Sequence, residues 1–100
     1  ASLFQSALDG GITEKMEDNC YYWLGECAYG EKKYDEAIKH FLKVFTFRIS
    51  EKKDDSQLMI GNSYLAMGNK EKAKEAFERF TKKFPASPFI KLVQEKLAKL

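Results

Sequence analysis

The fold of this 100-residue chain is decided by residues 21–45, which read YYWLGECAYGEKKYDEAIKHFLKVF. The same pattern returns 36 positions later in residues 57–81, QLMIGNSYLAMGNKEKAKEAFERFT. Few positions are identical, but small residues recur where two helices approach closely and large apolar residues recur where a core is filled. The identical pairs that carry the repeat are Gly25 with Gly61, Ala37 with Ala73 and Phe41 with Phe77.

Each copy of the repeat predicts two helices joined by a short break, and no useful stretch alternates with the period of two that is typical of strands. Gly30 is predicted to take a positive φ and end the first helix, and Gly68 with Asn69 ends the third. Asp54 or Asp55 is expected to cap the third helix. The predicted helices are residues 16–29, 34–47, 54–67 and 70–83.

Both ends of the chain read as incomplete repeats. Residues 1–9 carry an apolar stripe and are predicted to be the second helix of a truncated repeat. At the other end, Ser87 caps a helix over residues 87–100 and Pro88 occupies its first turn, so that this helix closes the stack. We therefore predict a single all-α domain, a right-handed α-solenoid of antiparallel helix pairs with about six helices. Its full repeats are residues 16–49 and 54–85.

The core of this solenoid is predicted where apolar residues of each copy fall on one side of their helix. On the first long helix, Cys20, Leu24 and Ala28 share the packing side. The predicted core is Leu24, Ala28, Ala37, Phe41, Val44, Ile60, Tyr64, Ala73, Phe77 and Phe80.

One ordered set of positions fits a known pattern, namely Leu24, Gly25, Ala37 and Phe41 in the first copy and Gly61, Tyr64, Gly68, Ala73, Phe77 and Pro85 in the second. The set resembles the tetratricopeptide repeat, a family of stacked two-helix units, over residues from about 16 to 88. The period exceeds the usual ~34 residues by two. In addition, Ile49 stands where the second copy has Pro85.

A narrower resemblance rests on four short motifs, YWLGE (22–26), YDEAI (34–38), SYLAMGN (63–69) and FPAS (84–87). Together they are similar to the C-terminal domain of the periplasmic Tol–Pal cell-division coordinators and, to a lesser degree, to outer-membrane assembly lipoproteins. This resemblance implies an envelope adaptor, located in the bacterial periplasm, that ties protein partners together during cell division or outer-membrane assembly. Otherwise a cytoplasmic location is expected.

Tyr22, Glu26 and Tyr29 form a strip along the first long helix, separate from its packing side. Known tetratricopeptide arrays place this strip on the concave surface, facing a bound segment. We expect the tyrosines to supply rigid contact area and the polar side chains to supply hydrogen bonds to an extended or helical peptide. The alternative is that N-terminal helices or a second copy of the chain cover the strip. The matching strip of the next repeat is Leu58, Asn62 and Leu65.

Two further features refine this expectation. Trp23 is predicted to be a wedge against the preceding repeat, near Phe4 and Leu8, with an exposed anchor for a partner as the alternative. The lysine and asparagine set with which some family members clamp a C-terminal carboxylate is absent, because Tyr22 and Glu26 occupy two of its places.

No catalytic site, metal site or cofactor is predicted, since the common nucleophile, zinc and nucleotide motifs are missing. Cys20 and Cys27 lie about 10 Å apart along one helix at ~1.5 Å per residue, too far for a disulfide. Both are expected to be buried free thiols. His40 is expected to be exposed, with no group to orient it for catalysis.

The charge distribution favours protein partners over nucleic acid. Residues 1–30 carry a net charge of −4 and residues 31–100 carry +6, which gives +2 overall. Lys70, Lys74 and Lys82 could follow phosphates, but no aromatic stacking platform interleaves with them and nearby acids would repel the backbone. No apolar run approaches the ~18–20 residues that span a bilayer.

The sequence thus predicts a non-catalytic scaffold that binds a protein or peptide on its concave face. The alternative is a self-association module, in which the open N-terminal side and the opposed end charges join copies of the chain. Because the chain opens at Ala1 without Met or a leader, we expect a mature or excised piece.

Overall fold

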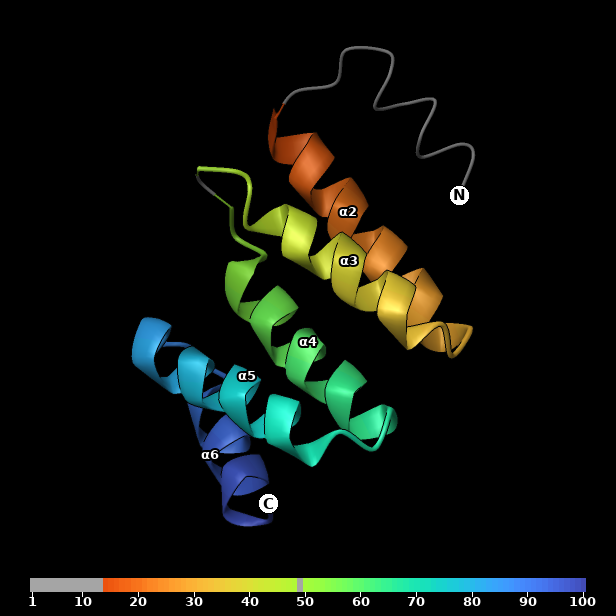
Figure 1. Ribbon diagram of the computed structural model, residues 1–100. Helices are drawn as coiled ribbons and strands as arrows, with labels where there is room; N and C mark the ends of the chain where they lie inside the picture. The colour runs from red at the N-terminus through yellow and green to blue at the C-terminus, as the bar shows by residue number, and fades with distance from the viewer. Residues whose placement is uncertain (1–13, 49) are drawn as a thin grey trace.

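The computed structural model describes residues 14–48 and 50–100, and its regular elements are all helices (Figure 1). The predicted all-helical class is confirmed for these residues, whereas the helix predicted over residues 1–9 lies outside them. The helices are α2 (Glu14–Gly30), α3 (Tyr34–Val44), α4 (Lys53–Ala66), α5 (Lys70–Lys83) and α6 (Ile90–Ala98).

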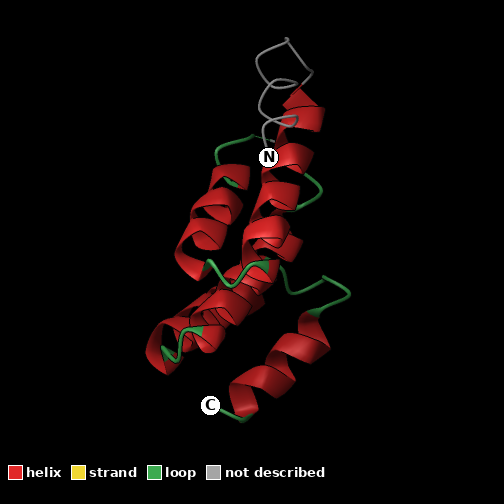
Figure 2. Cartoon of the chain, turned by 90° about the vertical axis from the view of Figure 1, so that its right-hand side faces the viewer, coloured by secondary structure: helices red, strands yellow, loops and turns green. Residues whose placement is uncertain are grey.

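The helices form a stack in which each contacts the next along the chain. Helix α2 packs antiparallel to α3, and α4 packs antiparallel to α5. The α3 helix then joins the first pair to α4, and α6 contacts α5. Figure 2 shows the helix that leads to the C-terminus, α6, at the opposite end of the stack from the start of α2. This order of contacts is the arrangement of a helical solenoid, in which neighbouring units bury one another's apolar faces.

The offset of 36 residues reappears in the packing of the two pairs. Gly25 of α2 faces the ring of Phe41, and a Cβ at that position would lie 2.6 Å from the ring's Cε1 atom. Gly61 of α4 faces Phe77 in the same way, and a Cβ there would lie closer still. Glycine therefore recurs because only a residue without a side chain lets these two helices approach so closely.

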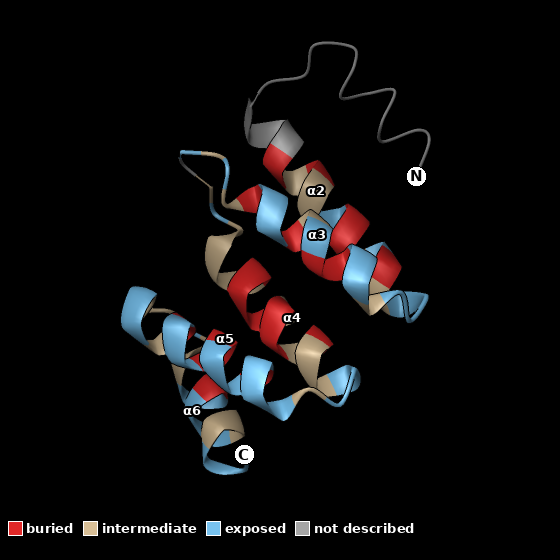
Figure 3. Ribbon diagram, in the orientation of Figure 1, coloured by how far each residue is buried: buried red, intermediate tan, exposed pale blue. Residues whose placement is uncertain are grey.

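The predicted core is buried, with one difference (Figure 3). Tyr64 is only half-buried, because it packs against both of the chain's apolar clusters from α4 while its ring lies 5.7 Å beneath the Lys72 amine at the surface. The buried members of the prediction are Leu24, Ala28, Ala37, Phe41, Val44, Ile60, Ala73, Phe77 and Phe80.

The helix ends lie close to the predicted positions, but only one of the two glycines takes the predicted positive φ. Gly68 takes the expected positive φ of 80°. Gly30 does not, because α2 continues through it and the chain reverses two residues later at Lys32, which has a φ of 63°. Lys33 N–H then donates back to the Ala28 carbonyl at 2.9 Å.

The helix starts need similar corrections. Asp54 and Asp55 do not cap α4 but lie in its first turn, where their charge complements the helix dipole. The helix over residues 87–100 begins only at Ile90, because Ser87 Oγ accepts from Phe89 N–H at 3.2 Å and holds the preceding residues in a turn. The same hydroxyl donates to Asp54 Oδ2 at 2.9 Å, which ties this turn to α4.

The cysteine and histidine predictions are each wrong in part. Both thiols are free, but Cys20 is buried while Cys27 is exposed. His40 is half-buried rather than exposed, and burial lowers its pKa below the usual value.

Candidate functional site

The α2 residues of the predicted strip are each half-buried and held by aromatic neighbours. The Tyr22 ring packs at 5.7 Å against Phe41 of α3, between ring centroids. The Tyr29 ring packs edge-on to Tyr34 at 5.4 Å. Both tyrosines therefore present part of a ring whose position α3 fixes, so that little entropy is lost when a partner covers it.

The α4 residues of the predicted strip are placed differently. Leu58 is only 8% exposed and belongs to the apolar cluster that α4, α5 and α6 share, so it does not line an open groove. Leu65 is half-buried against the same cluster. Asn62 is half-buried, and its Nδ2 donates to the sulfur of Met59 at 3.6 Å. Leu58 is thus part of the core, whereas Asn62 and Leu65 keep part of their surface exposed.

Residues at the start of α4 and just before it instead lie close to the strip residues of α2. Asp55 contributes to the pKa of both Tyr22 and Glu26, which places its charge near these side chains. The Lys52 amine lies 5.1 Å from the centroid of the Tyr22 ring and 6.0 Å from that of the Trp23 ring. We call this set the α2–α4 cluster: Tyr22, Trp23, Glu26, Lys52 and Asp55.

The electrostatics of the α2–α4 cluster are dominated by carboxylates that lose hydration. Burial, and then the charge of Asp55, raise the pKa of Glu26. Burial and Asp54 raise the pKa of Asp55, against an opposing effect of Lys52. Burial together with these acids raises the pKa of Tyr22 to about 12, so its hydroxyl remains a hydrogen-bond donor at neutral pH. Glu26 Oε1 is closed to solvent and accepts no hydrogen bond within the described part of the chain.

The sequence analysis did not include Asp55 and Lys52 among the candidate site residues. Only Asp55 could have been found from the sequence pattern. Asp55 extends the strip of Leu58, Asn62 and Leu65 by one helical turn, so the same periodicity could have found it. Lys52 lies in the link before α4 and follows no period.

Trp23 is 49% exposed, and its ring meets Tyr22 edge-on at 5.4 Å. The residues proposed to pack against it, Phe4 and Leu8, lie outside the described ranges. Its role as a wedge therefore stays a prediction.

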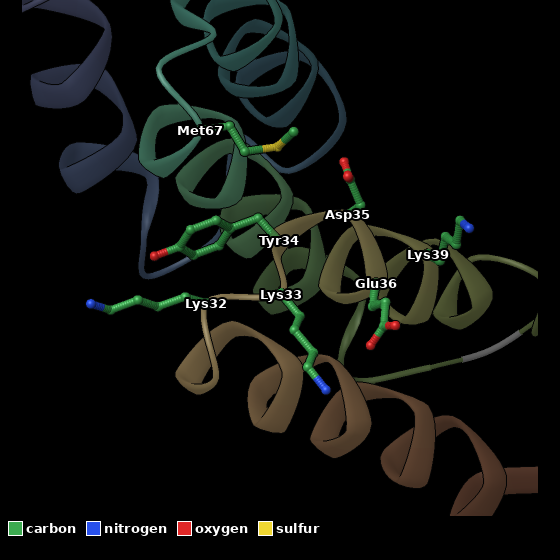
Figure 4. Close-up of a pocket in the computed structure, with 7 residues that line it drawn as sticks. All are labelled: Lys32, Lys33, Tyr34, Asp35, Glu36, Lys39 and Met67. Atoms are coloured by element: carbon green, nitrogen blue, oxygen red, sulfur yellow. The ribbon is translucent and has the colours of Figure 1, made fainter.

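A hollow of about 470 Å³ lies where the turn between α2 and α3 approaches the end of α4 (Figure 4). Its lysines point in different directions, and the acids at the start of α3 lie among them. Such a lining offers no converging set of groups for one ligand. The lining residues are Lys32, Lys33, Tyr34, Asp35, Glu36, Lys39 and Met67.

Over residues 14–48 and 50–100, no group of three or more His, Cys, Asp or Glu side chains could hold a metal ion. In the same ranges no helix combines the length and the apolar character needed to cross a bilayer.

Two family models described as tetratricopeptide repeat match this chain, one over residues 19–46 and the other over residues 55–87. Together they cover more than half of its length. The chain belongs to the tetratricopeptide repeat family. A comparison with curated proteins finds no match.

Each tetratricopeptide match falls on one helix pair, the first on α2 with α3 and the second on α4 with α5. Tetratricopeptide repeats generally mediate protein–protein interaction as scaffolds without catalytic activity, and their stacked units create extended concave binding surfaces. Protein partners are therefore indicated for this chain. Neither match narrows the family to the Tol–Pal coordinators or to the outer-membrane lipoproteins.

Proposed function

We propose that this protein is a non-catalytic scaffold that binds a segment of a partner protein along the inner surface formed by α2 and the start of α4. The observation that supports this most is the pair of half-buried tyrosines, Tyr22 and Tyr29, held in place by α3. Large, rigid aromatic side chains of this kind contribute much of the binding energy in protein interfaces.

Peptide selection tests this proposal. A displayed library of random peptides is selected on the intact chain, and the dissociation constant of the best peptide is then measured for Tyr22→Ala, Tyr29→Ala and Leu42→Ala. Each tyrosine variant is expected to bind about tenfold or more weakly. Leu42, which is 50% exposed on the outer helix α3, is the matched control and should leave the affinity unchanged. Unchanged affinity in both tyrosine variants, with helicity retained by circular dichroism, would contradict the proposal.

We also propose an envelope setting, in which the scaffold is periplasmic and joins protein partners during cell division or outer-membrane assembly. Its support is the resemblance of four motifs to the Tol–Pal coordinators, above all YWLGE at 22–26. Fractionation of the native host with an antibody to the chain tests this, since recovery in the cytoplasmic fraction alone would rule it out.

Self-association is the alternative function, and two exposed side chains favour it. Trp23 on α2 is 49% exposed and Leu92 on α6 is 43% exposed, so the first and the last described helix each present a large apolar group. Molar mass measured across concentration and salt distinguishes the two functions, because a monomer at all concentrations contradicts self-association.

A further inference from the structure

The last helix, α6, carries leucine and lysine side chains along one outer face. Leu92 is 43% exposed and Leu100 is 39% exposed. Lys96 is half-buried, Lys99 is exposed, and no carboxylate of the described residues pairs with either amine. The N–H groups of Lys99 and Leu100 donate to carbonyls one turn back, so both residues continue the helical turn. Their spacing is that of a single helix face. We call this set the α6 strip: Leu92, Lys96, Lys99 and Leu100.

The excess positive charge of the chain lies in α6 and just before it. Residues 82–100 hold five lysines and one glutamate, a net charge of +4. By contrast, residues 14–81 hold twelve basic and thirteen acidic residues, a net charge of −1. The one acid of the last segment, Glu95, lies on the neighbouring face of α6 and not within the α6 strip. The exposed leucines of this helix are therefore surrounded by basic side chains.

The α6 strip is not built to receive a further helix of the repeat. By the offset of 36 residues, Lys96 corresponds to Ile60 of α4, which is 5% exposed and packs in an apolar cluster with residues of α3 and α5. A helix packed on α6 in the same way would bury the Lys96 charge in apolar surroundings, which is strongly unfavourable. Leu97 likewise stands where Gly61 lets α5 approach α4.

A second copy of the chain also fits the α6 strip poorly. Joining Leu92 of one copy to Trp23 of another would bring the strip lysines toward Lys52, whose amine lies 6.0 Å from the centroid of the Trp23 ring. Joining two α6 strips would place lysines against lysines. Like charges brought together in a contact weaken association, so the charge of this face favours an anionic occupant.

The residue types of the α6 strip distinguish a lipid surface from a protein. Protein interfaces rely on Trp, Tyr and Arg and are poor in Lys. Leucines beside lysines, whose apolar stems reach along the surface to the headgroups, are typical of segments that lie on an anionic bilayer. We propose that the α6 strip docks on a lipid surface with anionic headgroups, with Leu92 and Leu100 inserted and Lys96 and Lys99 at the phosphates. This goes beyond the proposed function and is compatible with it, because α2 begins at the opposite end of the stack (Figure 2).

Vesicle flotation tests this proposal on the intact chain. The protein is mixed with vesicles of phosphatidylcholine alone and with vesicles in which about 30% of the lipid is anionic phosphatidylglycerol. The chain is expected to float with the anionic vesicles and to stay behind with the neutral ones. Raising the salt concentration from about 0.05 M to about 0.5 M should weaken the binding at least about tenfold, because salt screens the lysines from the phosphates.

Variants then locate the contact. Lys96→Gln combined with Lys99→Gln should bind the anionic vesicles about tenfold or more weakly. Leu92→Gln should also weaken binding but keep its dependence on salt, because it removes only an inserted apolar group. The matched control is Lys70→Gln combined with Lys74→Gln, which removes the same charge from exposed positions on α5 and should change the affinity less than about twofold. Circular dichroism checks that each variant keeps its helices.

Three results would overturn the proposal. Equal flotation with both kinds of vesicle, or with neither, does so without any change to the protein. A control pair that loses as much affinity as the strip pair would mean that net charge alone attracts the chain. If the intact chain is a dimer without vesicles and Leu92→Gln dissociates it, as molar mass in solution shows, a second copy covers the α6 strip instead.

Discussion

The two helix pairs share an interior but differ on their inner surface. In both pairs a glycine of the first helix faces a phenylalanine of the second, at Gly25 with Phe41 and at Gly61 with Phe77. The three strip residues of α2 are all half-buried, whereas on α4 Asn62 and Leu65 are half-buried and Leu58 is buried. Positions that repeat thus build the scaffold, and we propose that positions that differ decide where a partner binds.

The difference follows from what comes after each pair. The first pair is followed by another repeat, which α3 joins through its packing on α4. The second pair is followed by α6, whose Val93 is fully buried in the same cluster as Leu58 and Phe77. The last pair therefore uses Leu58 of its strip to close the stack, which is why we propose that a partner binds on α2 and the start of α4.

The largest expected effect tests the shared interior. Gly25→Ala and Gly61→Ala should each lower the free energy of unfolding by about 1–3 kcal/mol, because the added methyl overlaps a phenylalanine ring. Chemical denaturation measures both. Gly30→Ala is the matched control, since its Cβ would meet nothing within 4 Å and its φ is not positive, so stability should be unchanged or slightly higher. A cost confined to one of the first two variants would mean that the two interfaces are not equivalent.

A smaller effect tests a difference between the second helices of the pairs. Asn69 caps α5 by accepting from Lys72 N–H at 3.1 Å, whereas Lys33 at the start of α3 makes no such bond. Asn69→Ala should therefore cost about 1 kcal/mol of unfolding free energy and Lys33→Ala almost nothing.

The same comparison can be sharpened by moving the cap. The backbone at Lys33 (φ −93°, ψ 71°) is close to that at Asn69 (φ −93°, ψ 82°). Lys33→Asn should consequently stabilise the chain by about 0.5–1 kcal/mol in the same denaturation experiment. If Lys33→Asn does not raise the free energy of unfolding, the starts of α3 and α5 differ in more than the side chain at this position.

The smallest effect concerns the inner surface and depends on pH. The pKa of Glu26 in the folded chain is raised, so the folded state binds this proton more tightly than the unfolded state, and stability is lost as pH rises through the two values. Glu26→Gln should thus be more stable than the intact chain at pH 7. The difference should vanish as pH falls below the ordinary value of 4.5, where the glutamate is neutral in both states.

Denaturation of both chains across this pH range measures the effect. Asp54, Asp55 and Lys52 are common to both chains, but the repulsion between Asp55 and Glu26 is lost in Glu26→Gln, which adds to the expected gain in stability at pH 7. A Glu26→Gln chain that is less stable at pH 7 would mean that the carboxylate has a favourable partner.

The interior could be predicted from the sequence because its determinants are local and repeated. A glycine and a phenylalanine at fixed spacing in two copies identify the helix contact without coordinates. Gly68 forms a left-handed turn and Asn69 caps a helix, and both roles depend only on neighbouring residues in the sequence.

The inner surface could be predicted only in part because it depends on long-range packing. The periodicity placed Tyr22 and Tyr29 on one strip, and their part in binding stays a prediction. The burial of Leu58 depends on where α6 lies, and the place of Lys52 depends on the course of the link before α4. The reversal at Lys32 rather than Gly30 escaped prediction because α2 extends through the glycine.

Chemical-shift mapping by NMR tests the central claim most directly. The peptide selected on the intact chain is titrated into the isotopically labelled protein, and the amide shifts of every assigned residue are followed. The account predicts that the largest changes cluster on Tyr22, Glu26, Tyr29 and Asp55. Changes concentrated on the outer helices, around Leu42 of α3 or Arg79 of α5, would contradict it.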